Sequence, residues 1–312
     1  MGLRFIFVTA LVVSAPAAAQ EWIQNGDGSW CGPEGNASSI KHKALDHNKN
    51  RFAIPVASDF DQNVSLETIL EPGDDRTRWN DAKAAKLIGW VVDVKSGGSE
   101  TCNCQSDYEV DWDTHIEVAL APNAPKNERV IVEVTPRLRN AMASQGVDWS
   151  TTALADPQTG ILGRRVEFTG WLLFDYLHAN KAENTKPGGD RNWRATAWEL
   201  HPLTSIRIVP EPHVDATPHL THLRAARNTM AERLRAEPEL ARRIDAANAK
   251  ELEGLHPREL EIERHEQEAD RRPQTVVHAP SFVIVICPSP SNWRCECELR
   301  ASKRRHHGCR RW

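Results

Sequence analysis

The central part of the chain consists of segments in which apolar and polar residues alternate, the pattern of β-strands with one buried face. Each segment ends at turn-forming or loop residues, and residues 137–153, after the third segment, look helical or irregular. The five predicted strands are 86–94, 111–120, 129–135, 165–175 and 195–209. Five strands with an insert after the third predict a mostly β fold, an OB-like barrel over 86–209, with a small β-sandwich as the alternative.

The first 85 residues lack such a pattern. Residues 1–19 contain Arg4, the apolar run Phe5–Val13 and a group of alanines, which is typical of a cleaved signal peptide. The apolar run is too short to span a bilayer, and no other stretch is apolar enough, so we expect no transmembrane segment in the mature chain. Residues 20–85 are polar, and we interpret them as the N-terminal arm of an exported protein, periplasmic or secreted.

The last hundred residues differ from the predicted barrel. Residues 210–272 are dense in Arg, Glu and Ala, which favour helix, so they predict a charged helical extension. Its thin apolar stripe fits either a solvated, partly disordered appendage or a helix that binds a partner through 220–272. Residues 273–312 have a basic end and no periodic pattern, and we predict that they form a disordered tail.

The composition, with 40% hydrophobic and 26% charged residues, is that of a soluble globular protein. The net charge of -4 gives no indication of bulk nucleic-acid binding. Three of the seven cysteines lie outside the predicted tail. In an oxidising compartment we expect a disulfide from Cys31 to either Cys102 or Cys104, and a soft-metal site at Cys102-x-Cys104 is the alternative.

Carboxylates and imidazoles share one face of the predicted strands. They occupy alternate positions of the second, third and fifth strands, and a basic loop precedes the fifth. The resulting ligand-binding candidates are Asp111, Asp113, His115, Glu117, Glu133, Arg137, His178, Arg191, Trp193, Glu199 and His201. Two acid–imidazole pairs could meet across the barrel mouth and hold a divalent zinc, manganese or iron ion. The predicted metal ligands are His115, Glu117, Glu199 and His201. Polar residues on a half-exposed strand also have a purely structural interpretation.

The loop at 176–194 combines basic side chains with Trp193, a combination that could hold a phosphate chain or a sugar. The acidic face of the second strand would repel phosphate unless a cation lay between them. The lysines of this loop have a simpler interpretation as well, because they would keep an exposed loop soluble.

Four short motifs occur along the predicted barrel in a fixed order. They are Asp111-x-Asp-x-His115, Val-Ile-Val-Glu133, Phe174-Asp-x-x-His178 and Glu199-Leu-His-Pro202. The set resembles a broad family of exported bacterial proteins without a known function, over about residues 85–209. The resemblance implies an OB-like β-barrel and export, and it implies no established activity. Where the family often has Gly-Gln-x-Gly, this chain has Ala179–Ala182.

These patterns favour three functions. The first is a ligand-binding OB-like module that uses the face around His115 and Glu117 together with the 176–194 loop. The second is a metal-dependent hydrolase of phosphodiesters, in which Arg137 stabilises developing negative charge. The third is an envelope scaffold that binds a partner through 220–272.

Overall fold

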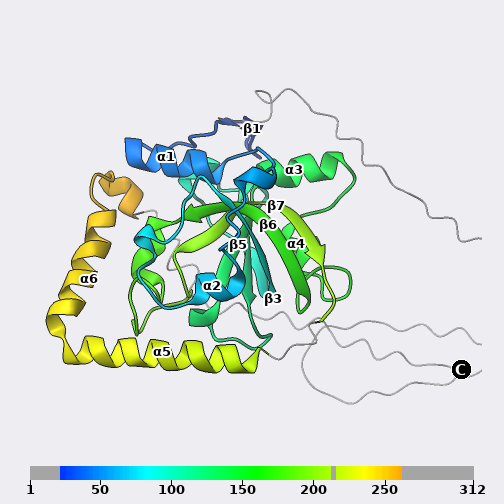
Figure 1. Cartoon of the computed structure of the whole chain (residues 1–312). Coiled ribbons are helices and arrows are strands. Elements are labelled where there is room, and N and C mark those ends of the chain that lie inside the picture. The colour runs from blue at the N-terminus through cyan, green and yellow to red at the C-terminus, as the bar shows by residue number, and fades with distance from the viewer. Residues whose placement is uncertain (1–21, 212–215, 262–312) are drawn as a thin grey trace, which may run out of the picture. The chain divides into compact units, whose positions relative to one another are not determined.

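The computed structural model describes residues 22–211 and 216–261 (Figure 1). The predicted signal peptide (1–19) and tail (273–312) lie outside these residues. Among the described helices, none has the length and apolarity needed to cross a bilayer. All the described residues belong to one compact unit, so the predicted arm and helical extension pack together with the barrel.

Five strands form a closed barrel, which confirms the OB-like architecture and excludes the β-sandwich. The strands are β3 (Ala84–Ser96), β4 (Thr114–Ala119), β5 (Val130–Val134), β6 (Arg165–Phe174) and β7 (Trp198–Ile208). Their order around the barrel is β3-β4-β5-β7-β6. The contact between β5 and β7 is parallel and the other four are antiparallel, which is the topology of an OB-like barrel.

The second and third strands are shorter than predicted, because local side chains end them. Asp111 lies in a 3-10 turn, η5 (Glu109–Asp111), and its carboxylate accepts hydrogen bonds from Gly26 N and Ser106 Oγ. At the end of β5, Thr135 caps the helix α3 (Pro136–Ser144), and Pro136 is well suited to the first helical position. Arg137 therefore lies on a helix rather than on the third strand.

Apolar side chains from alternate strand positions fill the barrel, including Ile116, Val132 and Leu200. The helices α2 (Leu66–Leu70) and α4 (Thr151–Ala155) add Leu66 and Leu154 to the same core. Because these residues point inward, their neighbours at odd positions of β4, β5 and β7 point outward. The strand phase therefore places the predicted acid–imidazole face on the outside of the barrel wall.

That outer face is covered by other parts of the chain. The covering elements are α1 (Ile40–Lys49), the 3-10 turns η4 (Thr101–Asn103) and η7 (Tyr176–Lys181), and the segment 182–197. A short hairpin, β1 (Ile23–Gln24) and β2 (Trp30–Cys31), is joined to the residue after η4 by the Cys31–Cys104 disulfide. The 3-10 turns η2 (Ala57–Asp59), η3 (Asp75–Thr77) and η6 (Lys126–Glu128) complete the connections.

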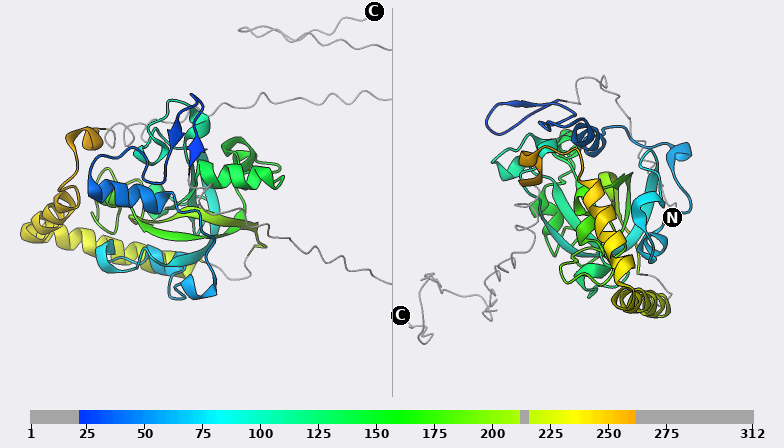
Figure 2. Two further views of the ribbon diagram at one scale, coloured as in Figure 1. Left: turned by 90° about the horizontal axis from the view of Figure 1, so that it is seen from above. Right: turned by 90° about the vertical axis from the view of Figure 1, so that its left-hand side faces the viewer.

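The helices predicted in the extension are present, and they pack on the barrel instead of projecting into solvent as an appendage. They are α5 (Thr217–Ala236) and α6 (Pro238–Glu251), which follow two sides of the barrel in Figures 1 and 2. Leu220 and Leu223 of α5 are buried, and Arg224 forms an ion pair with Glu128 at 2.6 Å. Asn248 of α6 donates a hydrogen bond to Thr185 O.

Candidate metal centre

The predicted meeting of two acid–imidazole pairs occurs, but on the outer face of three neighbouring strands rather than across the barrel mouth. His115 of β4 is directly opposite Glu133 of β5 in the antiparallel register. The parallel pairing of Val132 with Leu200 brings His201 of β7 beside Glu133 on its other side. The closed strand order makes β5 the neighbour of both β4 and β7, so the side chains do not have to reach across an opening.

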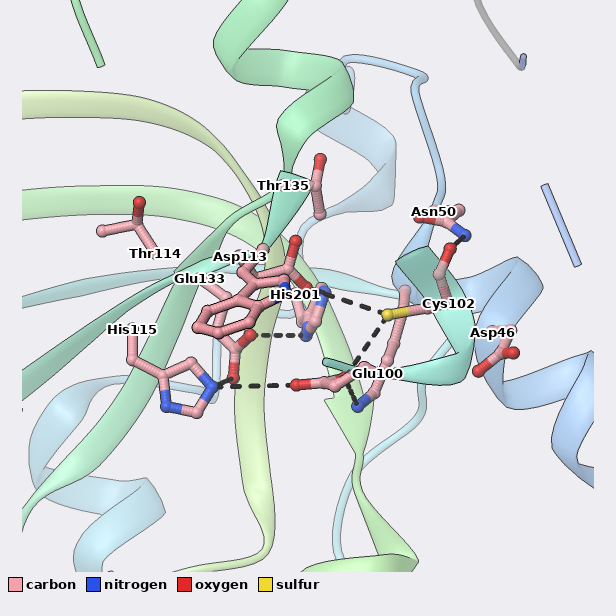
Figure 3. A network of polar contacts seen from close by, with 12 residues as sticks. Asp46, Asn50, Glu100, Cys102, Asp113, Thr114, His115, Glu133, Thr135 and His201 are labelled. Atoms are coloured by element: carbon pink, nitrogen blue, oxygen red, sulfur yellow. Dashed lines mark hydrogen bonds and ion pairs between the residues drawn. The ribbon is translucent and has the colours of Figure 1, made fainter. Parts of the chain in front are cut away.

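The Glu133 carboxylate lies between the two imidazoles, as Figure 3 shows. Its Oε1 is 2.8 Å from His115 Nε2, and its Oε2 is 3.4 Å from His201 Nδ1. Two more carboxylates approach His201: Asp113 Oδ2 is 3.4 Å from Nε2, and Glu199 Oε1 is 3.8 Å from Nδ1. One buried imidazole is therefore surrounded by three carboxylates.

The segment that links β3 to β4 adds Glu100 and Cys102 to the cluster. Glu100 Oε1 is 4.0 Å from His115 Nε2 (Figure 3). Its Oε2 accepts from Lys49 Nζ at 2.7 Å. Cys102 is a free, buried thiol that lies 3.3 Å from Glu100 Oε2 and 3.9 Å from Asp113 Oδ2. Sequence analysis missed Glu100 and Lys49 because both lie outside the strand pattern. The nearby Cys-x-Cys is the only signal for Glu100, and Lys49 has none.

The buried side chains of this layer contain more carboxylates than permanent cations. The carboxylates are Glu100, Asp113, Glu133, Asp175 and Glu199, and the cations in contact with them are Lys49 and Arg194. Lys49 contacts both Glu100 and Asp175, and Arg194 contacts Glu199 at 2.8 Å. Among these contacts, Asp113 and Glu133 have only imidazoles to balance their charge. Protonated histidines, a protonated carboxyl group or a bound cation must remove the remaining imbalance.

The pKa values reflect this imbalance. Burial, opposed by the two histidines, raises the pKa of Glu133 above that of an ordinary glutamate. Burial by itself lowers the pKa of His201, but Glu133 and Asp113 outweigh it and hold the pKa well above its usual range. Burial likewise raises the pKa of Asp113, but contact with His201 and the charge of Lys49 lower the pKa overall. The site therefore favours a positive charge at its centre.

The contacts around His201 are longer than ordinary hydrogen bonds, which are 2.7–3.2 Å for N–H···O. Within the described part of the chain, neither ring nitrogen of His201 makes a regular hydrogen bond, and neither do Asp113 Oδ1 and Glu199 Oε1. Three groups have ligand atoms within 4.8 Å of one another. They are Glu100–His115–Glu133, Glu100–Cys102–Asp113 and Asp113–Glu133–His201.

Two of the four predicted metal ligands have other partners. Glu117 accepts from Lys95 at 3.0 Å and from Arg129 at 2.6 Å, and it belongs to none of the three ligand groups. Burial raises the pKa of Glu117, but the two cations lower it overall, so its negative charge is already balanced. Glu199 accepts from Arg194 through one oxygen, and only its other oxygen faces His201. Glu117 therefore lies outside the candidate ligand groups, whereas Glu133, which was not among the predicted metal ligands, belongs to two of them.

Three other predicted site residues lie outside the cluster. Asp111 is held by the β1–β2 turn and by Ser106. Arg137 is buried and donates to Asn50 Oδ1 and to the backbone oxygens of Cys31 and Gly32. Arg191 is exposed.

The 176–194 loop covers the barrel wall rather than presenting a basic surface. His178 Nδ1 is 2.9 Å from Asp175 Oδ2, and the Trp193 ring packs edge-on against the His178 ring at 5.3 Å. Lys181 and Arg194 are buried. Arg191 is exposed and Lys186 pairs with Asp245, so the cations of the loop are divided between the interior and the surface. Phosphate binding by this loop stays a prediction.

The disulfide prediction is confirmed, with Cys104 as the partner of Cys31. The third cysteine, Cys102, is fully buried, and burial together with Glu100 and Asp113 raises its pKa well above the ordinary value.

Comparison with known proteins found no matching family model, no matching curated protein and no matching solved structure.

Proposed function

We propose that this protein is an exported OB-like module that binds a divalent transition-metal ion. The ion contacts Asp113, Glu133 and His201, and Glu100 and His115 lie on the other side of the shared Glu133 carboxylate. The observation that carries the proposal is the environment of His201: a fully buried imidazole, without a regular hydrogen bond, within 3.8 Å of three carboxylates.

The donor set suits zinc, manganese or iron, because these ions accept mixed imidazole and carboxylate ligands. A tetrahedral ion with bonds of about 2.1 Å keeps its ligand atoms about 3.4 Å apart. One such distance is present, 3.4 Å from His201 Nε2 to Asp113 Oδ2, whereas Glu133 Oε2 lies 3.4 Å from the other ring nitrogen, Nδ1. Ligand atoms of the three residues lie within 4.8 Å of one another. A divalent cation would also balance the two carboxylates that lack a permanent cation.

Burial favours a closed site over a catalytic one. The side chains of Glu100 and His115 are only 8% and 7% exposed, and that of His201 is 0% exposed. Structural metal sites are closed, whereas catalytic sites keep a position open for water or substrate. Arg137, which we predicted to stabilise developing negative charge in a phosphodiesterase, donates hydrogen bonds to Asn50 Oδ1 and Gly32 O instead. Export is supported by the Cys31–Cys104 disulfide, because such bonds persist in oxidising compartments.

The test is metal analysis of the mature chain, purified without chelators and again after chelation and reloading with zinc, manganese or iron. We expect about one equivalent of one metal per chain. His201→Gln and Glu133→Gln should lose it. Glu117→Gln is the matched control, because it makes the same carboxylate-to-amide change on the same barrel wall in a residue paired with Lys95 and Arg129.

Two results would contradict the proposal. The first is a wild-type chain that holds no metal after reloading and whose melting temperature does not respond to metal. The second is a His201→Gln variant that is folded and retains the full equivalent. In either case the cluster is an ion-pair layer that fastens the covering segments to the barrel.

A further inference from the structure

A second feature lies away from the metal centre, where α5 and α6 pack on the barrel. These two helices and the loops at 72–76 and 183–187 enclose a hollow of about 220 Å³. An adjoining hollow of about 230 Å³ continues along the same helices and shares Pro187 and Ile244 with it. The helices that surround both hollows are the ones along two sides of the barrel in Figures 1 and 2.

The walls of the first hollow combine an apolar part with a cationic part. Pro72, Pro187, Met230, Leu240 and Ile244 supply the apolar surface. Three arginines also line it: Arg76, Arg227 and Arg233. Binding sites for small molecules commonly combine a mostly apolar wall with a few placed polar groups.

The two acidic side chains of the hollow are already engaged. Asp74 forms an ion pair with Arg76 at 2.6 Å. Glu183 accepts from Gly188 N at 2.7 Å and from Asn192 Nδ2 at 2.8 Å. Arg233, which is exposed, pairs with Glu237. Arg227 is the remaining arginine of the hollow, and none of these contacts involves it.

Arg227 forms no ion pair within 4.0 Å among the residues that the structure describes, although it is only 7% exposed. Burial lowers its pKa overall, although the negative charges of Glu183, Glu128 and Asp75 act on it from farther away. Its guanidinium donates to two backbone oxygens, Asn127 O at 3.1 Å and Leu70 O at 2.9 Å. Its Nε is buried and makes no hydrogen bond in this part of the chain. A buried cation without a direct ion pair and with an unbonded N–H group is costly, so an anion that contacts it in the hollow is favoured.

We infer that this hollow binds a small amphiphile with one anionic head group, which Arg227 contacts, and a short apolar chain that lies against Met230, Leu240 and Ile244. The adjoining hollow extends the path for the chain past Ala231 and Leu234. The inference is independent of the metal centre, because no residue of either hollow belongs to that cluster.

The test is calorimetric titration of the mature chain with octanoate, octyl phosphate and octylammonium. We expect one of the two anions to bind with one-to-one stoichiometry, and the stronger of them identifies the head group as carboxylate or phosphate. Octylammonium should bind at least tenfold more weakly. Arg227→Gln should weaken binding of the anion by about 10- to 100-fold, the range for losing a hydrogen bond to a charged group.

Two further variants separate binding from folding. Met230→Trp fills the hollow while keeping the arginine, and it should abolish binding. Arg224→Gln, on the same helix, makes the same change in an exposed arginine paired with Glu128 and should leave affinity within twofold of wild type. The inference is overturned if neither anion binds the wild type, if octylammonium binds equally well, or if Met230→Trp, folded by circular dichroism, retains full affinity.

Discussion

Glu133 and His201 lie on adjacent parallel strands, with 3.4 Å between Oε2 and Nδ1. The whole α3–α4 insert, β6 and the 176–197 connection separate these two residues in the chain. The same carboxylate contacts His115 through its other oxygen at 2.8 Å. Glu133 is therefore the side chain that joins the two imidazoles, and the predictions below begin with it.

Removing the proposed metal should lower stability. An ion held at 100 to 1,000 times its dissociation constant stabilises the folded state by about 3 to 4 kcal/mol. We expect chelation to lower the melting temperature of the wild type and to have almost no effect on Glu133→Gln. Scanning calorimetry with and without chelator measures both. Equal responses of the two proteins to chelator would contradict this prediction.

Lys49 should be one of the most sensitive positions for stability. It is buried and contacts both Glu100 and Asp175, which raise its pKa well above the ordinary value against the opposing effect of burial. Lys49→Met leaves two buried carboxylates without their shared cation, so we expect a loss of about 3–5 kcal/mol in urea denaturation. Lys186→Met, which removes a surface ion pair with Asp245, should cost no more than about 1 kcal/mol.

Asp175 should contribute stability that disappears in acid. Burial raises its pKa, but Lys49 and His178 outweigh burial and hold the pKa well below the ordinary value. A carboxyl with a lowered folded-state pKa stabilises the protein fully above its unfolded pKa of about 3.9 and loses that contribution as the pH falls through the folded pKa. The stability difference between wild type and Asp175→Asn should therefore be full at pH 7 and shrink below about pH 4. Urea denaturation across this range tests it, and a difference that grows toward acid would contradict it.

The disulfide should hold the segment that carries Glu100 and Cys102. It joins cysteines 73 positions apart, and removing a native bridge typically costs about 2–5 kcal/mol. We expect a Cys31→Ser, Cys104→Ser double variant to lose stability in that range and to bind the proposed metal more weakly. Non-reducing peptide mapping of the wild type should recover the linked pair.

Cys102 should resist alkylation until the protein unfolds, because it is fully buried.

The sequence predicted the barrel because strand periodicity is a local property. Alternation of apolar and polar residues around Ile116, Val132 and Leu200 set which side of each strand faces the core. That phase also placed His115, Glu133 and His201 on the opposite side together. The ends of the strands were less predictable, since hydrogen bonds to Asp111 and the helix cap at Thr135 decided them.

Other features depended on which segments pack against each other, and alternation does not contain that information. The local pattern around Lys49 and Glu100 does not show that both residues cover the barrel wall. The pattern around Glu117 does not show that its carboxylate pairs with Lys95 and Arg129. The chain by itself determined five strands, their inward and outward faces, and a disulfide from Cys31. The tertiary structure decided that the outward polar face is buried. Burial removes water from the carboxylates, and the charges that compensate for it come from segments distant in sequence.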